Sequence, residues 1–589
     1  MFIVEKQELT AMTQREKNIT FLIGNGFDVG MGMKSQYSDF YKVYTQPGSP
    51  YFPDGGENEL VRELRAAVEE QLPHWSYYEK WFGKLTMQYD EHIIKGEKTE
   101  EIRGILLTQN EEFQKKFYKY LIAQEAALVV KGNSNQQSLE SFRKIFSGHS
   151  IDAVEAANLQ KCFGKLVDAC DEAMKKGEDA SDFSKKCQDW GLDFLQNFTE
   201  NQKKQKSEPT FEERVGSIML DGIRCFYSRD NIDDGETAVV DALNKNVDYD
   251  LAATRNYRFV CFNYSSVIDR CVAALVAERE KRYKRLIGKV KRAYTKGKIP
   301  VFSAKDLKNL SAFMPEYHEK VLSCIKDYGD KCSKNILCPE EAKESCEKFL
   351  KQWFEAEKFQ AVHHGHGALS EAEHSVLVMG VNDGTQIGEA FGEDQNKSYS
   401  NRLIKKQIMS KKPKQYETTT EMINSSNVIV VYGMSIGDTD KDYWADIYEW
   451  LKGGPKGDTS RQLIFYMYDS SYEPLSPNNL KQIVTNYMKQ FRDMTWRLDE
   501  EVEWCDYSKK KFCFRSGICT KSQWCTRELC NGHNLAQWCA ANGLGSSDAD
   551  AKDKLCEMTC CPEYERCKEW IEIRKRIHFA IHKNIFSLK

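Results

Sequence analysis

The chain has 589 residues, a formal net charge of −4, 41% apolar residues and 29% charged residues. This composition is typical of a globular protein with several structural units, and the small net charge excludes a general attraction to nucleic acid or acidic membranes. No run approaches the roughly 18 apolar residues that span a bilayer, and the N-terminus lacks a signal-peptide layout, so we expect a cytoplasmic protein.

The first predicted element is a short apolar run, Ile19–Ile23, which is followed by Gly24-Asn25-Gly26-Phe27-Asp28. The run predicts a buried strand of a parallel sheet. The glycines permit a sharp turn and a close approach of the backbone to a ligand, and Ser35 is the expected cap of the next helix. Strand, glycine turn and helix together are typical of a phosphate cradle, although a tight turn without a ligand explains the same residues.

The next two hundred residues are mostly charged, with few strand-like runs. Glu111–Val130 and Asn158–Lys175 place apolar residues at three- and four-residue spacing, which predicts amphipathic helices. We therefore interpret 58–256 as a large helical insertion. A strand is expected to return at Tyr257–Phe262, with Asn263 directly after it.

A strongly basic helix is expected at Arg279–Lys298, where ten of twenty residues are Lys or Arg. Such a stripe could contact phosphates. Aromatic residues interleave only at Tyr283 and Tyr294, which favours a solvated helix face over a nucleic-acid surface.

Short strands and helices then alternate. Strands are expected at Phe359–His363, Val376–Met379, Asn427–Tyr432, Leu463–Tyr468 and Arg576–Ile581, and helices at Glu417–Ser425 and Lys441–Leu451. This alternation predicts an α/β fold with a Rossmann-like parallel sheet, interrupted by large helical insertions and by a Cys-rich insertion near the C-terminus.

Ten of the twenty cysteines crowd into Cys505–Cys567. The best zinc candidate there is Cys525-x4-Cys530-x2-His533-x5-Cys539, which has four ligands of suitable type. No Cys-x2-Cys pair occurs in the segment, so reduced structural thiols are the favoured interpretation, and zinc stays an open alternative.

These features predict a core that is interrupted three times. The expected divisions are 1–57 as the first part of the core, 58–256 as a helical insertion, 257–278 as core, 279–354 as a basic helical insertion, 355–500 as core, 501–570 as the Cys-rich insertion and 571–589 as the final core strand.

Four polar clusters each follow a predicted strand. They are Gly24–Asp28, Phe262–Tyr264, His364–Gly367, and Gly433-Met434-Ser435 with Asp438 and Asp440. Because the ligand crevice of an open parallel sheet lies beyond the carboxyl ends of its strands, we expect these distant clusters to meet in one pocket.

The same motifs resemble the AbiH family of bacterial abortive-infection proteins, which act against phage. The resemblance is carried by Gly24–Asp28, Tyr37–Phe40, Phe262–Tyr264, His364–Gly367, Met379–Val381 and Gly433–Tyr443. It covers the sheet-forming segments and not the insertions. AbiH-like proteins in turn resemble the sirtuin-like fold, whose strand-end Asn and His are linked to cleavage of the nicotinamide–ribose bond of NAD.

The resemblance implies roles for individual residues. Asn263 and His366 would be the catalytic pair, and Gly24, Asn25, Gly26, Gly433 and Ser435 would line the nucleotide. Asp28 or Asp440 would bind ribose hydroxyls, as acidic residues do in other dinucleotide sites. AbiH-type sequences often have His where this chain has Met434, which leaves His366 as the principal candidate.

The chemistry suits these residue types. Nicotinamide leaves NAD as a neutral amine, so the site must supply orientation and a base, for which a neutral imidazole is suited near pH 7. Each residue has a structural alternative: His366 could turn a loop, Asn263 could cap a strand end and Asp440 could cap a helix. A metal site at His363, His364 and His366 is disfavoured, since neighbouring strand positions point to opposite faces.

We therefore expect a phage-defence protein with a nucleotide pocket that hydrolyses NAD or a related nucleotide. One alternative is a nucleotide-binding sensor or switch without turnover, and another is a nucleic-acid-acting effector that uses Arg279–Lys298. The expected partners are a nucleotide, a phage-derived trigger or a partner defence protein, and further copies of the chain in an oligomer.

Overall fold

The computed structural model describes residues 16–45, 58–70, 78–94, 99–132, 211–225, 254–296, 298, 300, 315–334, 336–368, 378–381, 384–391, 402–410, 413–437, 440–453, 461–468, 484, 486–492, 569 and 573–582. The Cys-rich block, Asp438 and the predicted helix Asn158–Lys175 lie outside this range.

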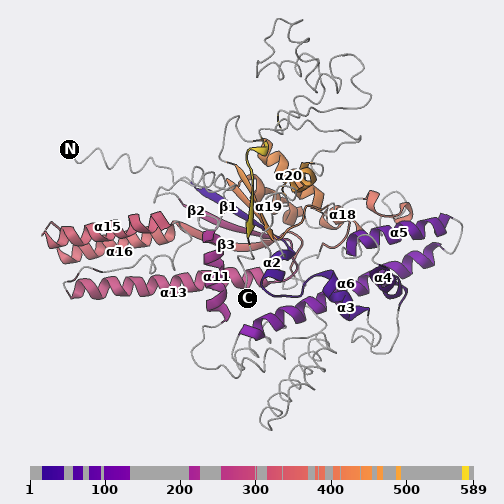
Figure 1. Ribbon diagram of the computed structural model, residues 1–589, viewed down its shortest axis with the longest axis horizontal. Coiled ribbons are helices and arrows are strands. Elements are labelled where there is room, and N and C mark those ends of the chain that lie inside the picture. Colours follow the sequence, from indigo (N-terminus) through magenta and orange to yellow (C-terminus); the bar gives the residue numbers. More distant parts are fainter. Residues whose placement is uncertain are drawn as a thin grey trace, which may run out of the picture.

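A six-stranded parallel sheet forms the centre of the molecule (Figure 1). Its strands are β1 (Lys17–Ile23), β2 (Arg255–Cys261), β3 (Glu357–His364), β4 (Val428–Tyr432), β5 (Gln462–Tyr468) and β6 (Ile577–His582). Their order is β3-β2-β1-β4-β5-β6, and every neighbouring pair is parallel. The predicted α/β fold class is confirmed, and the strand order reverses between β1 and β4, where sheets of this kind form a ligand crevice.

Six predicted strands are present with small shifts at their ends, whereas the seventh, Val376–Met379, is described only at its last two residues. Val378 and Met379, within the predicted strand Val376–Met379, are irregular, and the following segment contributes one isolated bridge, Val381 to Ile404. The apolar character of this segment comes from burial in a loop, since Val378, Met379 and Val381 are all buried.

The helices precede, separate and follow the strands. They are α2 (Asn25–Gly30), α3 (Tyr37–Tyr44), α4 (Glu59–Glu69), α5 (Tyr78–Ile94), α6 (Thr99–Gly132), α11 (Phe211–Cys225), α13 (Val267–Thr295), α15 (Pro315–Ser333), α16 (Pro339–Glu355), α18 (Lys405–Ser410), α19 (Pro413–Asn424) and α20 (Lys441–Lys452), with 3-10 turns at Gly384–Gln386 and Glu389–Phe391.

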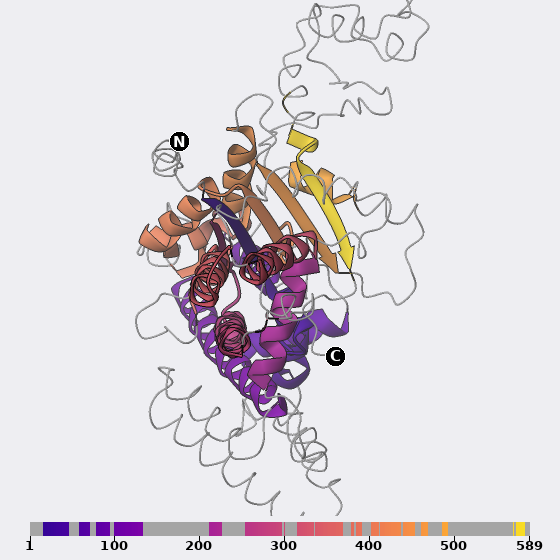
Figure 2. The same ribbon diagram turned by 90° about the vertical axis from the view of Figure 1, so that its left-hand side faces the viewer.

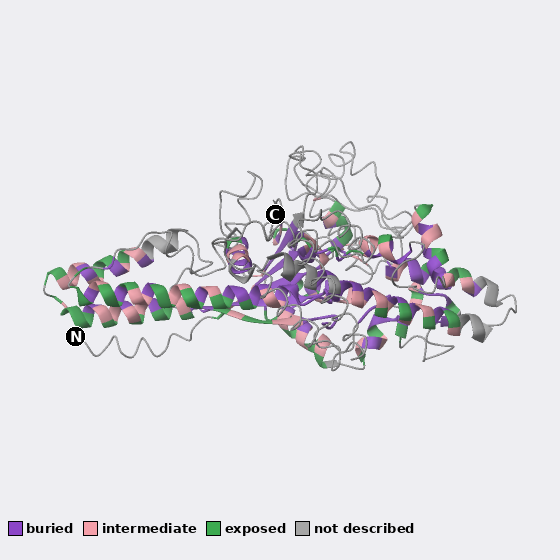
Figure 3. Ribbon diagram, turned by 90° about the horizontal axis from the view of Figure 1, so that it is seen from below, coloured by how far each residue is buried: buried purple, intermediate pink, exposed green. Residues whose placement is uncertain are grey.

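Both faces of the sheet are covered, as the alternation of side chains along β4 illustrates. Val428 and Val430 join a core with α2 to α6, α11 and the first half of α13. Ile429 and Val431 join a second core with α19 and α20. Figure 2 shows the two helical layers on either side of the strands. The interior of this three-layer arrangement is the buried centre of the molecule in Figure 3.

The helices of the predicted insertion 58–256 share their core with the sheet. Leu64 of α4, Phe113 of α6 and Met219 of α11 belong to the same buried cluster as Phe21 of β1. These described helices are therefore one of the two layers that cover the sheet.

A second group of helices projects from the sheet as an arm (Figures 1 and 3). The distal half of α13 packs with α15 and α16 around its own core, which includes Leu286, Val290, Leu350 and Trp353. Because α13 is one continuous helix, the expected division between 278 and 279 falls inside it.

Candidate active site at the carboxyl ends of the strands

The glycine turn after β1 packs directly against the loop after β4. The Gly24 N–H donates to Tyr432 O at 2.9 Å, and the Gly26 N–H donates to Gly433 O at 2.9 Å. A Cβ atom on Gly24 would lie 2.4 Å from Gly433 O, and Gly433 has φ +66°, which disfavours a side chain there. Close packing of two protein backbones thus accounts for these glycines.

The predicted phosphate cradle needs free N–H groups at this turn. The N–H of Gly26 bonds to Gly433 O, and the N–H of Phe27 donates to Gly24 O at 3.0 Å. Two donors at the start of α2 are therefore used within the protein. Nucleotide binding by Gly24, Gly26 and Gly433 stays a prediction, and it would have to use other groups or a rearranged turn.

Asn25, at the start of the short helix α2, and Ser35, beyond its end, are joined by two hydrogen bonds. Ser35 Oγ donates to Asn25 Oδ1 at 2.5 Å, and Asn25 Nδ2 donates to Ser35 O at 3.2 Å. The predicted capping role of Ser35 is wrong, since α3 begins after Gln36 and has no side-chain cap. The Ser35 hydroxyl bonds to Asn25 and is not available to cap.

Asn263 connects the end of β2 to the glycine turn. Its side-chain Nδ2 donates to Gly24 O at 3.0 Å, and the residue is buried. The preceding Phe262 N–H donates to Ile23 O, and Phe262 O accepts a hydrogen bond from His366 Nδ1 at 3.2 Å. The first glycine turn, Asn263 and His366 therefore meet at one edge of the sheet, as the strand-end argument predicts.

His366 lies in a buried cluster with Asp440 and Lys405. Its Nε2 atom is 3.2 Å from Asp440 Oδ1, and Lys405 Nζ donates to the same oxygen at 3.0 Å. The side chain of His366 is 5% exposed and that of Lys405 is 6% exposed. Asp440 precedes α20 without making a side-chain cap, so its role as a simple helix cap is wrong. The carboxylate faces this cluster.

The neighbouring charges shift the pKa values of His366 and Asp440. Burial and the positive charge of Lys405 lower the pKa of His366, whereas Asp440 raises it, and the net pKa lies below the ordinary value. Burial disfavours ionised Asp440, but the positive charge of Lys405, joined by that of His366 whenever the imidazole is protonated, outweighs burial and holds the pKa of Asp440 well below its usual range. At neutral pH the cluster is an Asp440–Lys405 ion pair beside a neutral imidazole.

The hydrogen bond to Phe262 fixes the tautomer of that imidazole. A backbone carbonyl only accepts, so Nδ1 carries the proton in the neutral ring. Nε2 is then the basic nitrogen, and it faces Asp440 without the alignment of a hydrogen bond. A proton taken up at Nε2 would be stabilised by the adjacent carboxylate.

A second buried polar group surrounds the beginning of α13. Ser265 Oγ donates to Asp28 Oδ2 at 2.6 Å, and Ser266 N donates to Glu125 Oε2 at 3.0 Å. Burial raises the pKa of Asp28 to about 7, against the hydrogen bond from Ser265. Asp28 lies inside the protein, with 1% of its surface exposed, so in this state it cannot reach a ribose hydroxyl.

His364 belongs to this second group and not to the first. Its Nε2 atom lies 2.8 Å from Asp269 Oδ2 at the start of α13. Burial disfavours its charged form, but Cys261 and Asp269 outweigh burial and raise the pKa of His364. His363 points the other way and bonds to Gln415 O and Thr419 Oγ1 of α19. Neighbouring histidines thus face opposite sides of the sheet, as alternation predicts.

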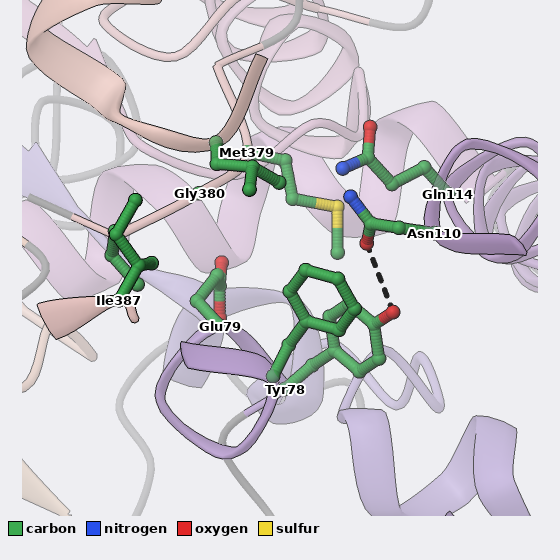
Figure 4. A pocket seen from close by; sticks show the side chains of 10 residues that line it. Tyr78, Glu79, Asn110, Gln114, Met379, Gly380 and Ile387 are labelled. Atoms are coloured by element: carbon green, nitrogen blue, oxygen red, sulfur yellow. Dashed lines mark hydrogen bonds between the residues drawn. The ribbon is translucent and has the colours of Figure 1, made fainter. Parts of the chain in front are cut away.

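A narrow cavity borders the His366 cluster through the segment Val378–Val381. Val378 N donates to His366 O at 2.9 Å, and Lys405 N donates to Val381 O at 2.7 Å. The cavity is lined by Tyr78, Glu79, Phe82, Asn110, Gln114, Met379, Gly380, Val381, Ile387 and Leu403 (Figure 4). The centre of a water molecule can reach about 10 Å³ of it, which is room for about one water.

Some residues of the candidate site have no sequence signal. Lys405 stands beside Lys406 in a charged segment, and only its burial against Asp440 distinguishes it. Glu79 of α5 lies near enough to influence the pKa of His366, although it is nearly three hundred residues away in sequence. Ser435, a predicted nucleotide-lining residue, is exposed on the loop after β4.

The described residues also bear on metal and membrane binding. In this part of the chain, no group of three or more His, Cys, Asp or Glu side chains is arranged to hold a metal ion. The predicted zinc ligands of the Cys-rich block fall beyond the described ranges. Within those ranges, no helix combines the length and apolar character that crossing a membrane requires.

The parallel sheet with helices on both faces, and with a His–Asp–Lys cluster at the carboxyl ends of its strands, defines a doubly wound, Rossmann-like α/β protein. Residues 20–169 match the family model described as bacteriophage abortive infection AbiH, which confirms the predicted resemblance over that range. The match begins in β1 and includes the Gly24–Asp28 motif, but it also runs through residues 58–169, so the expectation that the resemblance leaves out the helical insertion is wrong. Abortive infection is a defence against phage, and the matched range is about a quarter of the chain. No curated protein and no solved structure matches the chain.

Proposed function

We propose that this AbiH-like protein acts in phage defence by binding a nucleotide at the carboxyl edge of the sheet and hydrolysing NAD or a related nucleotide. The main support is one observation: a neutral His366 with a basic Nε2 atom lies next to Asp440, close to the point where the strand order reverses. Asn263 supplies an amide at the same edge.

In the proposed reaction, water transfers a proton to Nε2 of His366 as its oxygen bonds to C1′ of the ribose. The bond from C1′ to the pyridinium nitrogen breaks, and its electron pair stays on nitrogen, so nicotinamide leaves neutral. After the proton transfer, Asp440 would return to the imidazolium and stabilise it, and such base catalysis typically contributes about a hundred- to ten-thousand-fold in rate.

The described state is closed, which supports an enzyme that needs a trigger. His366 is 4% exposed and Asn263 is 7% exposed. Asp440 faces the nitrogen that must accept the proton, so turnover requires His366 and Asp440 to separate. A defence enzyme that remains closed until infection would spare the nucleotides of the uninfected cell.

The test is a phage infection of cells that express the full chain. NAD and related nucleotides are measured before and after infection for the wild type and for His366→Ala and Asn263→Ala. The expected result is a loss of NAD, or of a related nucleotide, on infection with the wild type alone, together with loss of protection in both variants.

His363→Ala is the matched control, since it removes an imidazole from β3, three residues before His366, and leaves the His366 cluster intact. It should retain both protection and nucleotide loss. Protection by the wild type with unchanged nucleotide levels would exclude hydrolysis. Protection that survives His366→Ala would exclude the proposed base.

A nucleotide sensor without turnover is the second candidate. It is favoured by the burial of His366, which keeps water away from the proposed base. In that case a wild-type protein would bind nucleotide and protect cells with no nucleotide consumed, and His366→Ala would bind as the wild type does.

A further inference from the structure

A cleft lies between α11 and α13, away from the His366 cluster. Its lining consists of Arg214, Ser217, Ile218, Glu278, Lys281, Arg282 and Arg285. The centre of a water molecule can reach about 520 Å³ of the cleft, which falls within the size of small-molecule sites. Figure 1 shows α11 lying across α13 beside the sheet.

The cleft results from a close contact between the two helices. A Cβ atom on Gly216 of α11 would lie 2.8 Å from Ala274 O of α13, so glycine lets the backbones approach. The next turn of each helix then contributes the side chains that line the cleft, from Ser217 and Ile218 on one side and Glu278 and Lys281 on the other.

The lining is strongly positive. Four of its residues are basic, and Glu278 is the one acidic residue among them. Glu278 pairs with Arg282 at 2.5 Å and with Lys281 at 3.8 Å, and the formal charge of the lining residues is +3, from four basic residues and one acidic residue. Arg285 is exposed at the distal end of the lining. A concave surface of one sign attracts and holds anions.

A line of basic residues continues the cleft along α13. Lys281, Arg285, Lys289, Arg292 and Lys296 are all exposed. Their spacing of four, four, three and four residues places them within about 80° of the helix circumference, over a length of about 22 Å. We name these five residues the basic stripe.

The other conspicuous residues of the predicted basic helix point into the protein. Arg279 is buried between the rings of Phe354 and Phe359, with its guanidinium 4.6 and 4.7 Å from their centroids. Tyr283 stacks on Phe354, and Tyr294 is buried in the core of the arm. Neither tyrosine is placed to stack on a base, so recognition here would depend on phosphates alone.

We infer that the cleft and the basic stripe bind the phosphodiester backbone of a nucleic acid, without reading its sequence. A free phosphate or nucleotide would need only the cleft, whereas the stripe is long enough to meet several successive phosphates. The net charge of −4 does not reveal this basic surface, because acidic residues elsewhere in the chain balance its positive charge.

The test measures binding of a fluorescein-labelled single-stranded oligonucleotide to the full chain by fluorescence anisotropy at several salt concentrations. The test variant is Arg285→Glu with Arg292→Glu, two exposed positions on the stripe. The control is Lys326→Glu with Lys348→Glu, which makes the same charge change at exposed positions on α15 and α16.

The wild type should bind, with an affinity that falls steeply as salt rises. The stripe variant should lose more than about tenfold in affinity and show a shallower salt dependence, because phosphate contacts are removed. The control variant and His366→Ala should bind as the wild type does, which separates this surface from the proposed hydrolytic site.

Several results would overturn the inference. The inference is wrong if the oligonucleotide does not bind the wild type, or if the stripe and control variants lose equal amounts of affinity for it. It is also wrong if the affinity depends on the base sequence of the oligonucleotide. Unlabelled ATP and inorganic tripolyphosphate serve as competitors. If they bind in a stripe-dependent way while the oligonucleotide does not, the site is a free-phosphate site and the nucleic-acid assignment is wrong.

Discussion

Asp28 shows how one buried side chain can make a protein sensitive to pH. One of its oxygens accepts a hydrogen bond from Ser265, and the other has no hydrogen-bond partner within the described part of the chain. Burial raises its pKa to about 7 from an ordinary 3.8. The folded protein therefore binds a proton more tightly than the unfolded chain does between these two values.

Replacing Asp28 with Asn should remove this dependence. In the wild type, the contribution of Asp28 to stability is full below pH 4 and is lost as pH rises through 7, by about 4 kcal/mol in all. Asp28→Asn keeps the acceptor for Ser265 without the charge, so its apparent melting temperature should fall less between pH 4 and pH 7 and exceed that of the wild type above pH 7.

Asp39→Asn is the control, since its carboxylate is partly exposed on α3. Its melting temperature should follow the wild-type pH profile. An Asp28→Asn profile parallel to that of the wild type would show that Asp28 is not protonated in the folded protein.

The location of His366 and Asn263 could be predicted, but their surroundings could not. The rule that ligand groups follow parallel strands places both residues at one edge from sequence alone. The partner Lys405 is far from them in sequence and lies in an ordinary charged segment, so only the folded chain brings it to Asp440. Likewise, nothing in the sequence around Asp440 shows whether its side chain caps the following helix or forms an ion pair.

The loops after β1 and β4 make a close backbone contact at the candidate site. Gly24 has an ordinary φ of −105°, so steric contact alone excludes a side chain there. At Gly433, both the close contact and the positive φ disfavour a side chain. The contact locks together the two strands at which the order of the sheet reverses.

Gly24→Ala should therefore destabilise the protein strongly. Its Cβ would lie 2.4 Å from Gly433 O and from Met434 Cα, both of which are backbone atoms that cannot turn aside. Overpacking of this kind costs about 1 to 3 kcal/mol or more, and we expect a clearly lower melting temperature.

Gly288→Ala is the opposite case and serves as the control. A Cβ there meets nothing within 4 Å, and Gly288 lies inside α13, where Ala favours the helix by about 0.5 to 1 kcal/mol. Its melting temperature should be unchanged or slightly higher. If Gly24→Ala were equally stable, the two loops would not be packed as described.

Most strands could be predicted from the sequence, but the apolar segment at Val378 could not be told apart from a strand. Continuous apolar runs such as Asn427–Tyr432 can only be buried strands or short buried helices, and their flanking turns decide between the two. The apolar segment at Val378 lacks such neighbours, and it packs as a buried loop. Burial and strand pairing both favour apolar residues, so pattern alone cannot separate them.

At the scale of the whole molecule, the described chain contains two kinds of helical addition. The helices between β1 and β2 share a core with the sheet, whereas α15, α16 and the distal half of α13 have a core of their own. The sequence predicts amphipathic helices in both groups. The periodicity of apolar residues shows that one face of each helix is buried, but it does not show which element covers that face. The expected domain divisions could not resolve this difference.

Leu350→Ala should loosen the arm and leave the sheet intact. Leu350 is fully buried in the arm core, and the cavity would cost about 2 to 5 kcal/mol. Hydrogen–deuterium exchange should accelerate in α15, α16 and the distal half of α13, with no change in β1 or β4. Ile336→Ala, at a position that is 64% exposed, should change neither region. Equal acceleration in the sheet would show that arm and sheet unfold as one unit.

The continuity of α13 has a mechanical consequence. Its 29 residues make a rod about 43 Å long, whose first turn presents Asp269 to His364 and whose later turns carry the basic stripe. A helix transmits displacement along its axis with little bending, because each turn is hydrogen-bonded to the next. A partner that binds and shifts the distal turns of α13 should therefore also displace Asp269 and its contact with His364 at the carboxyl edge of the sheet.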